Sequence, residues 1–201
     1  MYKLYEFFSS GNCYKIRLLL TQLDIPFQTK EINILKGESR TPEFLTKNLN
    51  GRIPVLEIEP GKFLAESNAI LFYLSEGTDF SPTDSFEKAQ ILQWLFFEQY
   101  SHEPYIATSR FWITTGKAEE YREALNQKRA GGEAALKVME RHLTEHQFFV
   151  GERYTIADIA LFAYTHVADE GGFDLAEFPA IQAWIKRVQA QPKHISITQQ
   201  V

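Results

Sequence analysis

The sequence contains one cysteine, Cys13, among its 201 residues. A single thiol cannot form an intrachain disulfide, and a chain of this length can bury enough apolar surface to fold without one. The first residues also lack the apolar core of a secretory signal peptide. We therefore expect a cytoplasmic protein whose fold needs no disulfide framework.

Long apolar runs and basic clusters are missing as well. No stretch approaches the roughly 20 consecutive apolar residues that a membrane-spanning helix requires. The formal net charge is −5, and the densest basic stretch, Lys128 and Arg129, is soon followed by Gly131, Gly132 and Glu133. Neither a membrane nor a nucleic acid is therefore an expected partner.

The first part of the chain combines strand and helix patterns. The patterns predict strands at 2–8, 26–34, 53–58 and 62–65, and helices at 14–23, from Pro42 onward and at 67–74. In the first helix, Lys15 and Arg17 fall on other faces than the apolar side chains. Thr41 and Pro42 suit the cap and first position of the second helix. The predicted order is β-α-β-α-β-β-α.

From residue 77 the pattern changes to helices throughout. Residues 77–85 have little to bury, and Asp84 and Glu87 have the spacing of a capping box. The predicted helices span 86–115, 117–146, 155–167 and 178–191. Pro104 should kink the first, and the Gly131-Gly132 pair should weaken the second. We therefore predict an α/β domain at 1–76, a linker at 77–85 and an all-helical domain at 86–201.

The turn between the first strand and the first helix is the first candidate for chemistry. It contains Ser9, Ser10 and Cys13. Backbone N–H groups and the positive helix end can stabilise a thiolate there, and a serine hydroxyl can donate a hydrogen bond to it. Alternatively, Ser9 or Ser10 only caps the helix. Cys13 is interpreted as a small packed residue, and a thioredoxin-type oxidoreductase that uses its thiol is the alternative.

Two further pairs of residues stand where the chain enters a strand or a helix. Pro54 follows Ile53 at the start of a strand, where a cis peptide bond would turn the backbone of Ile53 toward a peptide ligand; an ordinary trans bond is the alternative. Glu66 and Ser67 begin a helix, where they could receive the ammonium and carboxylate groups of an amino acid. The alternative is that Ser67 is only an N-cap.

The order of these motifs on the β-α-β-α-β-β-α frame, followed by Thr155-Ile156-Ala157-Asp158, resembles the cytosolic glutathione transferase family over essentially the whole chain. The resemblance implies a thioredoxin-like first domain that binds glutathione as co-substrate. It also implies a helical domain with a site for a small hydrophobic electrophile, a homodimer, no metal, and a role in detoxification.

The resemblance also assigns roles to individual residues. The glutathione-binding candidates are Ile53, Pro54, Glu66 and Ser67, with Asn50, Arg52, Lys36 and Arg40 for the glycyl end. Tyr5 is too early in the chain for the catalytic tyrosine of some classes. Ser10 matches the catalytic serine of the theta and zeta classes and their bacterial relatives, with Ser9 as second choice. The zeta isomerases carry Ser-Ser-Cys in this turn, from which Ser10-Gly11-Asn12-Cys13 departs.

The second-substrate site is expected around the predicted kink, between the two domains. Its candidates are Phe8, Tyr100, Tyr105, Arg110 and Phe111. Aromatic residues make up 14% of the chain, so most rings belong to a core rather than a cleft. For Arg110 the options are a role in the cleft or a salt bridge to a glutamate. Thr155 and Asp158 are expected to be structural.

Several activities fit these residues. The main hypothesis is conjugation of glutathione to a hydrophobic electrophile. Alternatives are glutathione-dependent disulfide or peroxide reduction, in which glutathione supplies the thiols, and a maleylacetoacetate-type isomerisation. A binding or regulatory module without activity is the non-enzymatic alternative, which the retention of Ser10, Ile53-Pro54, Glu66 and Ser67 disfavours.

Overall fold

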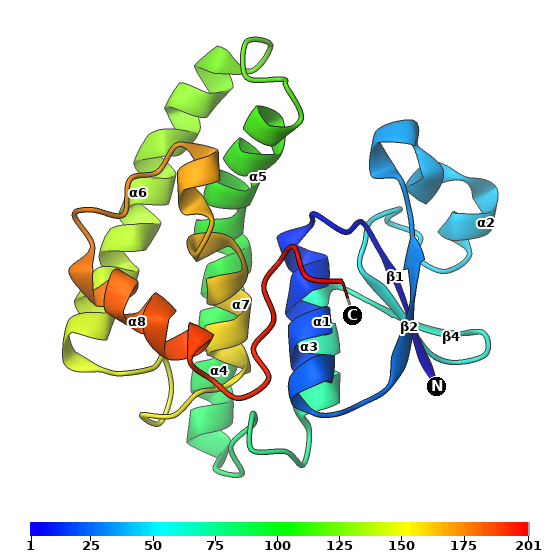
Figure 1. Ribbon diagram of the computed structural model, residues 1–201, viewed down its shortest axis with the longest axis horizontal. Coiled ribbons are helices and arrows are strands. Elements are labelled where there is room, and N and C mark those ends of the chain that lie inside the picture. Colours follow the sequence, from blue (N-terminus) through cyan, green and yellow to red (C-terminus); the bar gives the residue numbers. More distant parts are fainter. Residues whose placement is uncertain (201) are drawn as a thin grey trace. The chain divides into compact units, whose positions relative to one another are not determined.

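Two compact units make up the chain in the computed structural model, which describes residues 1–200 (Figure 1). The first unit contains residues 1–76 together with the C-terminal segment from Pro192, and the second contains residues 77–191. The sequence pattern predicts a helical domain that extends to the C-terminus. Residues 192–200 instead pack with the first unit. The predicted linker packs within the second unit, where the carbonyl of Phe80 accepts from Ile156 N at 3.2 Å.

A four-stranded sheet in the order β2-β1-β3-β4 organises the first unit. Its strands are β1 (Tyr2–Glu6), β2 (Phe27–Glu31), β3 (Val55–Glu59) and β4 (Lys62–Ala65), and its helices are α1 (Gly11–Gln22), α2 (Pro42–Leu45) and α3 (Ser67–Ser75), with 3-10 turns at Ile34–Lys36 and Glu38–Arg40. Strand β1 is parallel to β2 and antiparallel to β3, which is antiparallel to β4. The predicted β-α-β-α-β-β-α order and thioredoxin-like fold class are confirmed.

The two faces of the sheet are covered by different helices. Alternate strand residues point to opposite faces. On one face Phe44 of α2 packs with Tyr5, Ile32 and Val55. Figure 1 shows α1 and α3 together on the other side of the sheet. Thr41 caps α2 as predicted, because its hydroxyl oxygen accepts from Phe44 N at 3.2 Å.

Helix α1 is buried on more faces than its sequence pattern indicated. Lys15 and Arg17, which the pattern put on other faces than the core, are 0% and 1% exposed. Lys15 Nζ donates to Ser67 Oγ and Asn68 Oδ1, each at 3.3 Å. The C-terminal segment covers another part of α1, where the Tyr14 hydroxyl donates to Ile195 O at 2.7 Å. The side chains of Lys15 and Tyr14 therefore bond to partners that are distant in sequence.

The second unit is built from helices. They are α4 (Ser85–Phe97), α5 (Glu103–Thr114), α6 (Arg122–Glu145), α7 (Ile156–Thr165) and α8 (Pro179–Gln189), with a 3-10 turn at Ala168–Gly171. The sequence predicted one kinked helix over 86–115. Instead, a π-helical turn, Glu98–His102, separates α4 from α5. Pro104 has no N–H to donate, so the wide turn falls just before it.

The glycine pair in α6 makes room for aromatic rings. A Cβ atom on Gly131 would lie 2.3 Å from Cε1 of Tyr105, and one on Gly132 would lie 2.3 Å from Cε1 of Phe173. Each glycine therefore lets a ring lie directly against the helix backbone. Glycine lowers the stability of a helix, and at these two positions the packing of the rings offsets that loss.

The predicted capping boxes differ in outcome. Asp84 caps α4 by accepting from Phe86 N and Glu87 N, whereas Glu87 pairs with Arg153 at 2.8 Å. The box of Thr155 and Asp158 at α7 is complete. The Asp158 carboxylate is fully buried and also accepts from Phe149 N at 3.2 Å and from Trp184 Nε1 at 3.0 Å. It thus links α7 and α8 to the segment before α7.

The burial of Asp158 predicts a pH-dependent contribution to stability. Burial raises the pKa of this carboxyl from its usual 3.8 to about 6. Between these pH values the folded chain holds a proton that the unfolded chain has released. The stabilisation is therefore complete below pH 3.8 and is lost as pH rises through about 6. Asp158→Asn should remove up to about 1.4 kcal/mol per pH unit from the slope of the unfolding free energy in this window.

Urea unfolding at several pH values measures this slope. The exposed Asp174 provides a matched control, since Asp174→Asn makes the same substitution in the same unit. The interpretation is wrong if Asp158→Asn and the wild type have the same slope.

Among the described residues, no helix has the length and apolar character needed to cross a bilayer.

Candidate functional site

The register of the sheet brings three segments of the first unit to one end. Tyr5 pairs with Val55, and Val55 pairs with Ala65. Tyr5 lies near the end of β1, Val55 at the start of β3 and Ala65 at the end of β4. The chain segments that adjoin the strands at these residues therefore lie next to one another, at one end of the sheet. These segments contain Ser9, Ser10, Ile53, Pro54, Glu66 and Ser67. The main residues predicted to bind glutathione therefore lie at the same end of the sheet.

Ser10 lies at the N-cap of α1, and Ser9 is exposed one position earlier. The Ser10 hydroxyl oxygen accepts from Cys13 N at 3.4 Å, and Ser10 N donates to Phe7 O at 2.8 Å. The expected cap is therefore present. A cap uses the hydroxyl oxygen as an acceptor, so its proton can still be donated to a ligand. Capping and thiolate stabilisation are compatible roles for this one side chain.

Cys13 is not available as a nucleophile. Its side chain is fully buried, and burial raises the pKa of its thiol to about 12. A reactive cysteine needs an accessible thiolate near neutral pH. The interpretation of Cys13 as a packed residue is confirmed, and the thioredoxin-type alternative that relied on its thiol is not supported.

The loop before β3 contains a cis peptide bond between Ile53 and Pro54. The sequence left cis and trans open, since both are sterically allowed before proline. Asn48 Nδ2 donates to the carbonyl of Arg52 at 2.8 Å, which fixes the loop just ahead of this bond. The backbone of Ile53 thus leaves the sheet at the end shared with the Ser10 turn.

Of the four candidates for the glycyl end of glutathione, two are joined by a hydrogen bond. Arg40 Nη1 donates to Asn50 O at 2.8 Å, so these two residues lie together. The Arg52 side chain is exposed on the same loop as Asn50. Lys36 is exposed on the separate Ile34–Lys36 turn.

Glu66 and Ser67 take different positions from those predicted at the start of α3. Glu66 rather than Ser67 occupies the N-cap position, and its side chain makes no cap hydrogen bond. Its φ of 69° lies in the left-handed region, which costs energy for a residue other than glycine. The prediction that Ser67 is the N-cap is therefore wrong. An exposed carboxylate in a strained backbone position is a feature that functional sites often retain.

Ser67 belongs to a polar network that the sequence analysis missed. Its side chain is buried, accepts from Lys15 Nζ, and donates to Asn12 Oδ1 at 3.1 Å. Asn12 lies two residues after Ser10, so the network joins the Ser10 turn to the start of α3. The Ser-Gly-Asn-Cys motif contained the signal for Asn12, because an amide in the first turn of a helix can reach the same ligand as the N-cap. No local pattern indicated Lys15.

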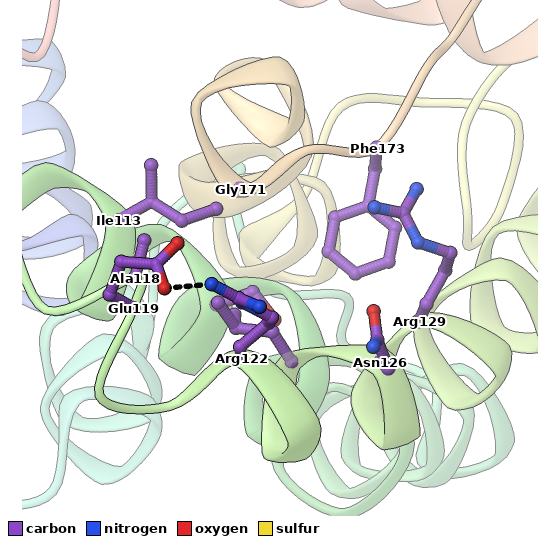
Figure 2. A pocket seen from close by; sticks show the side chains of 10 residues that line it. Ile113, Ala118, Glu119, Arg122, Asn126, Arg129, Gly171 and Phe173 are labelled. Atoms are coloured by element: carbon purple, nitrogen blue, oxygen red, sulfur yellow. Dashed lines mark hydrogen bonds and ion pairs between the residues drawn. The ribbon is translucent and has the colours of Figure 1, made fainter.

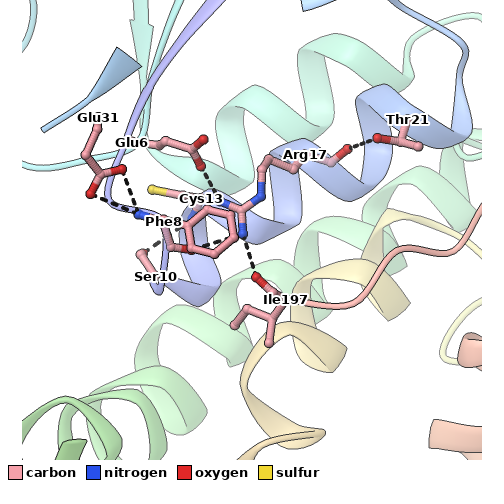
Figure 3. Close-up of polar contacts among 8 residues, drawn as sticks. All are labelled: Glu6, Phe8, Ser10, Cys13, Arg17, Thr21, Glu31 and Ile197. Carbon is pink, nitrogen blue, oxygen red and sulfur yellow. Dashed lines mark hydrogen bonds and ion pairs between the residues drawn. The ribbon is translucent and has the colours of Figure 1, made fainter. Parts of the chain in front are cut away.

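Arg17 holds the backbone that leads into the Ser10 turn (Figure 3). Its guanidinium forms a buried ion pair with Glu6 and donates through Nη2 to Phe8 O and Ile197 O, each at 3.0 Å. The Phe8 ring centroid lies 4.6 Å from Arg17 Cζ. The carboxylate of Glu31 accepts from Phe8 N at 3.2 Å. Phe8, a predicted second-substrate residue, is thus fixed by its backbone and ring.

The other second-substrate candidates lie in the second unit and differ in exposure and contacts. Tyr100 is 85% exposed on the π-helical turn. Tyr105 packs on Gly131, with Lys128 Nζ at 5.7 Å from its ring centroid. Arg110 Nε donates to Glu170 at 2.7 Å, which is the salt bridge expected as one of its two options. Phe111 is half-buried on α5.

The described residues contain no group of three or more His, Cys, Asp or Glu side chains that could hold a metal ion. At the end of the sheet beside the Ser10 turn, the polar side chains that are not buried include those of Ser10, Asn12 and Glu66. They are suited to hydrogen bonds and charge pairing with a peptide-like ligand.

Comparison with known proteins identifies relatives of both units. A family model described as "Glutathione S-transferase, N-terminal domain" matches residues 1–76, and one described as "Glutathione S-transferase, C-terminal domain" matches residues 92–192. The disulfide-bond oxidoreductase YfcG of Escherichia coli is 29% identical over an alignment that covers 92% of this chain and 89% of that protein.

Solved structures are similar over nearly the whole chain. The crystal structure of a glutathione S-transferase from Pseudomonas fluorescens Pf-5 is 53% identical, with a TM-score of 0.96, and the match covers 98% of this chain and 99% of that one. Ure2p in complex with glutathione is 27% identical, with a TM-score of 0.85, and the match covers 96% and 95% of the two chains.

Proposed function

The chain belongs to the glutathione S-transferase family. We propose that it binds glutathione at the end of the sheet where the Ser10 turn, the Ile53-Pro54 bond and Glu66 lie, and that it activates the thiol for attack on a small hydrophobic electrophile. The observation that carries this proposal is the strand register from Tyr5 through Val55 to Ala65, which gathers the Ser10 turn, the cis Ile53-Pro54 bond and Glu66 at one end.

Each part of the tripeptide has a matching group. Glu66 can receive the ammonium of the γ-glutamyl residue, and the backbone N–H of Ser67, at the start of α3, can donate to its carboxylate. The backbone of Ile53 can pair with the cysteinyl residue, as an added strand pairs with a sheet edge. Arg40 and Asn50 are the best-supported candidates for the glycyl carboxylate, because a hydrogen bond joins them. Lys36 and Arg52 are secondary candidates.

Activation of the thiol follows from its surroundings. A free thiol has a pKa near 8.5, so little thiolate is present at neutral pH. A hydrogen bond from the Ser10 hydroxyl and the positive end of α1 both favour the anion. The thiol proton passes to solvent as the thiolate forms. A sulfur lone pair then makes the new carbon–sulfur bond, while the electron pair of the bond that breaks in the electrophile leaves with the departing group or, in an addition, moves to the adjacent atom, which solvent protonates. We assign this role to Ser10, with Ser9 as second choice. The assignment corresponds to the serine-type classes.

The helical second unit, residues 77–191, is proposed to bind the electrophile. Tyr100, Tyr105, Arg110 and Phe111 of this region, with Phe8 of the first, remain the candidate contacts. A cytoplasmic location and a role in detoxification complete the proposal.

Glutathione-dependent disulfide or peroxide reduction is the second candidate function. The buried Cys13 favours it over any mechanism with a protein thiol, and a relative carries the name disulfide-bond oxidoreductase. The thiolate of one glutathione would attack the substrate disulfide to form a mixed disulfide, which a second glutathione would resolve into glutathione disulfide. No observation specifically favours the maleylacetoacetate-type isomerisation or the non-enzymatic module.

A homodimer is proposed from an exposed aromatic row on α4 and the turn that follows it. Phe86, Phe96 and Tyr100 are 70%, 69% and 85% exposed, and Phe96 and Tyr100, four positions apart, are neighbours on the helix surface. Rows of this kind are unusual on the surface of a monomer. Sedimentation of the wild type and of Phe96→Asp tests the proposal, which fails if the wild type is monomeric.

Calorimetric titration with glutathione tests the proposed binding site. Glu66→Gln should weaken binding by about tenfold or more, because it removes a charge-assisted contact to the ammonium. Glu59→Gln is the matched control, since Glu59 lies at the other end of β3. The proposal is wrong if the wild type does not bind glutathione, or if both variants bind as it does.

A further inference from the structure

A cavity of about 310 Å³ lies among α5, the segment before α6, α6 itself and residues 171–173 (Figure 2). Two glycines shape it. Gly132 lets the Phe173 ring lie against α6, and Gly171 lets its turn approach α5, since a Cβ atom there would lie 3.2 Å from Arg110 N. The cavity is thus a product of close backbone packing in the second unit.

The lining of the cavity has an apolar part and a basic part. Phe173, Ile113 and Leu125 supply apolar surface. Arg122, Asn126 and Arg129 also line it and follow one another at helical spacing on α6, so they share one face (Figure 2). The site therefore presents hydrogen-bond donors beside an aromatic ring.

The charge of the lining differs in sign from that of the protein. Arg122 and Arg129 against Glu119 leave one net positive charge, whereas the chain carries −5. The carboxylate of Glu170, next to Gly171, is already held by Arg110. An anion is therefore the favoured occupant.

The two arginines are positioned to bind that anion. Arg129 Nη1 donates to Gly172 O at 3.0 Å, which orients the guanidinium and leaves its other N–H donors for a ligand. Arg122 pairs with Glu119, and both side chains are largely exposed. Exposed pairs of this kind contribute little free energy, so a ligand carboxylate can replace Glu119.

We propose that this cavity binds a small organic carboxylate with an aromatic or branched apolar body. The carboxylate would lie between the Arg122 and Arg129 guanidinium groups, whose planar donors match it, and the apolar body would lie against Phe173. The volume is at the lower end of the range for small-molecule sites, about 300–1,000 Å³. All lining residues belong to the second unit, so the inference is independent of the proposed glutathione site.

Fluorescence titration with 2-naphthoate tests the proposal, with the neutral 2-naphthamide as the matched probe. Saturating S-hexylglutathione is present throughout to occupy the glutathione site. The wild type should bind 2-naphthoate about tenfold more tightly than the amide. Arg122→Gln and Arg129→Gln should each remove most of this preference without changing the affinity for the amide. Arg141→Gln, an exposed position on α6 outside the cavity, should leave both affinities unchanged.

A steric variant locates the bound probe. Ala118 lines the cavity. Ala118→Phe should lower the affinity for both probes, because the larger side chain fills the cavity. The proposal is overturned if the wild type does not bind 2-naphthoate saturably or binds the two probes equally. It is also overturned if Arg141→Gln reduces the preference as much as Arg129→Gln does, or if Ala118→Phe binds 2-naphthoate as the wild type does.

Discussion

Replacing Ser10 by alanine is expected to lower kcat/KM for glutathione conjugation by about 100-fold, the usual effect of removing one donor from a developing anion. The Ser10 hydroxyl lies at the N-cap of α1. In the proposed mechanism, the helix dipole and a hydrogen bond donated by this hydroxyl both stabilise the glutathione thiolate. Without the hydroxyl, the pKa of the bound thiol should rise, and the pH–rate profile should shift to higher pH. The ultraviolet absorbance of the thiolate in the glutathione complex measures that pKa directly.

Two controls separate this role from capping. Loss of the cap alone costs about 1 kcal/mol of stability, so thermal unfolding of Ser10→Ala should change only modestly. Ser9→Ala, one position earlier and exposed, should keep the thiol pKa of the wild type. If Ser10→Ala also keeps that pKa, Ser10 is only a cap. Asn12, which accepts from Ser67 at the same edge, is then the next residue to test.

Replacing Arg17 by methionine should destabilise the protein by about 3–5 kcal/mol, the usual cost of breaking a buried ion pair. The variant leaves Glu6 buried without its guanidinium and removes the donors to Phe8 O and Ile197 O. Burial already raises the pKa of Glu6, and Arg17 opposes that shift. The pKa should therefore rise further in Arg17→Met, so its stability should be lost increasingly as pH rises and Glu6 ionises.

Urea unfolding of Arg17→Met, Glu6→Gln and the double variant, at acidic and neutral pH, tests this interpretation. The double variant should be more stable than Arg17→Met at neutral pH, because no charge is left buried alone. Equal stability of the double and single variants at neutral pH would contradict the charge argument. If Arg17→Met is as stable as the wild type, the buried ion pair does not stabilise the fold and the interpretation is wrong.

Local signals made much of the fold predictable. The strand and helix order of the first unit depends on alternation, helical spacing and turn residues, which are all properties of short segments. The caps at Thr41, Asp84 and Thr155 were predicted for the same reason, since each side chain bonds to its own helix start. The Ser10 turn and the Ile53-Pro54 pair were located because they fall between such elements.

The errors concern partners that are distant in sequence. Lys15 lies 52 positions from Ser67, and Arg17 lies 180 positions from Ile197, so no local pattern could indicate that these charges are buried. The placement of residues 192–200 failed for the same reason. The Ser67 cap failed differently, because a left-handed Glu66 is locally unfavourable and only the surrounding structure imposes it.

The C-terminal segment determines when the first unit can form all of its hydrogen bonds during synthesis. The buried donors of Tyr14 and Arg17 find acceptors on Ile195 and Ile197, which leave the ribosome after every helix of the second unit. A nascent chain that has emerged only through α3 carries the whole sheet but lacks these acceptors. N-terminal domains generally fold first during translation. Here the unit that emerges first can form its last hydrogen bonds only after residues 195–197 have been made.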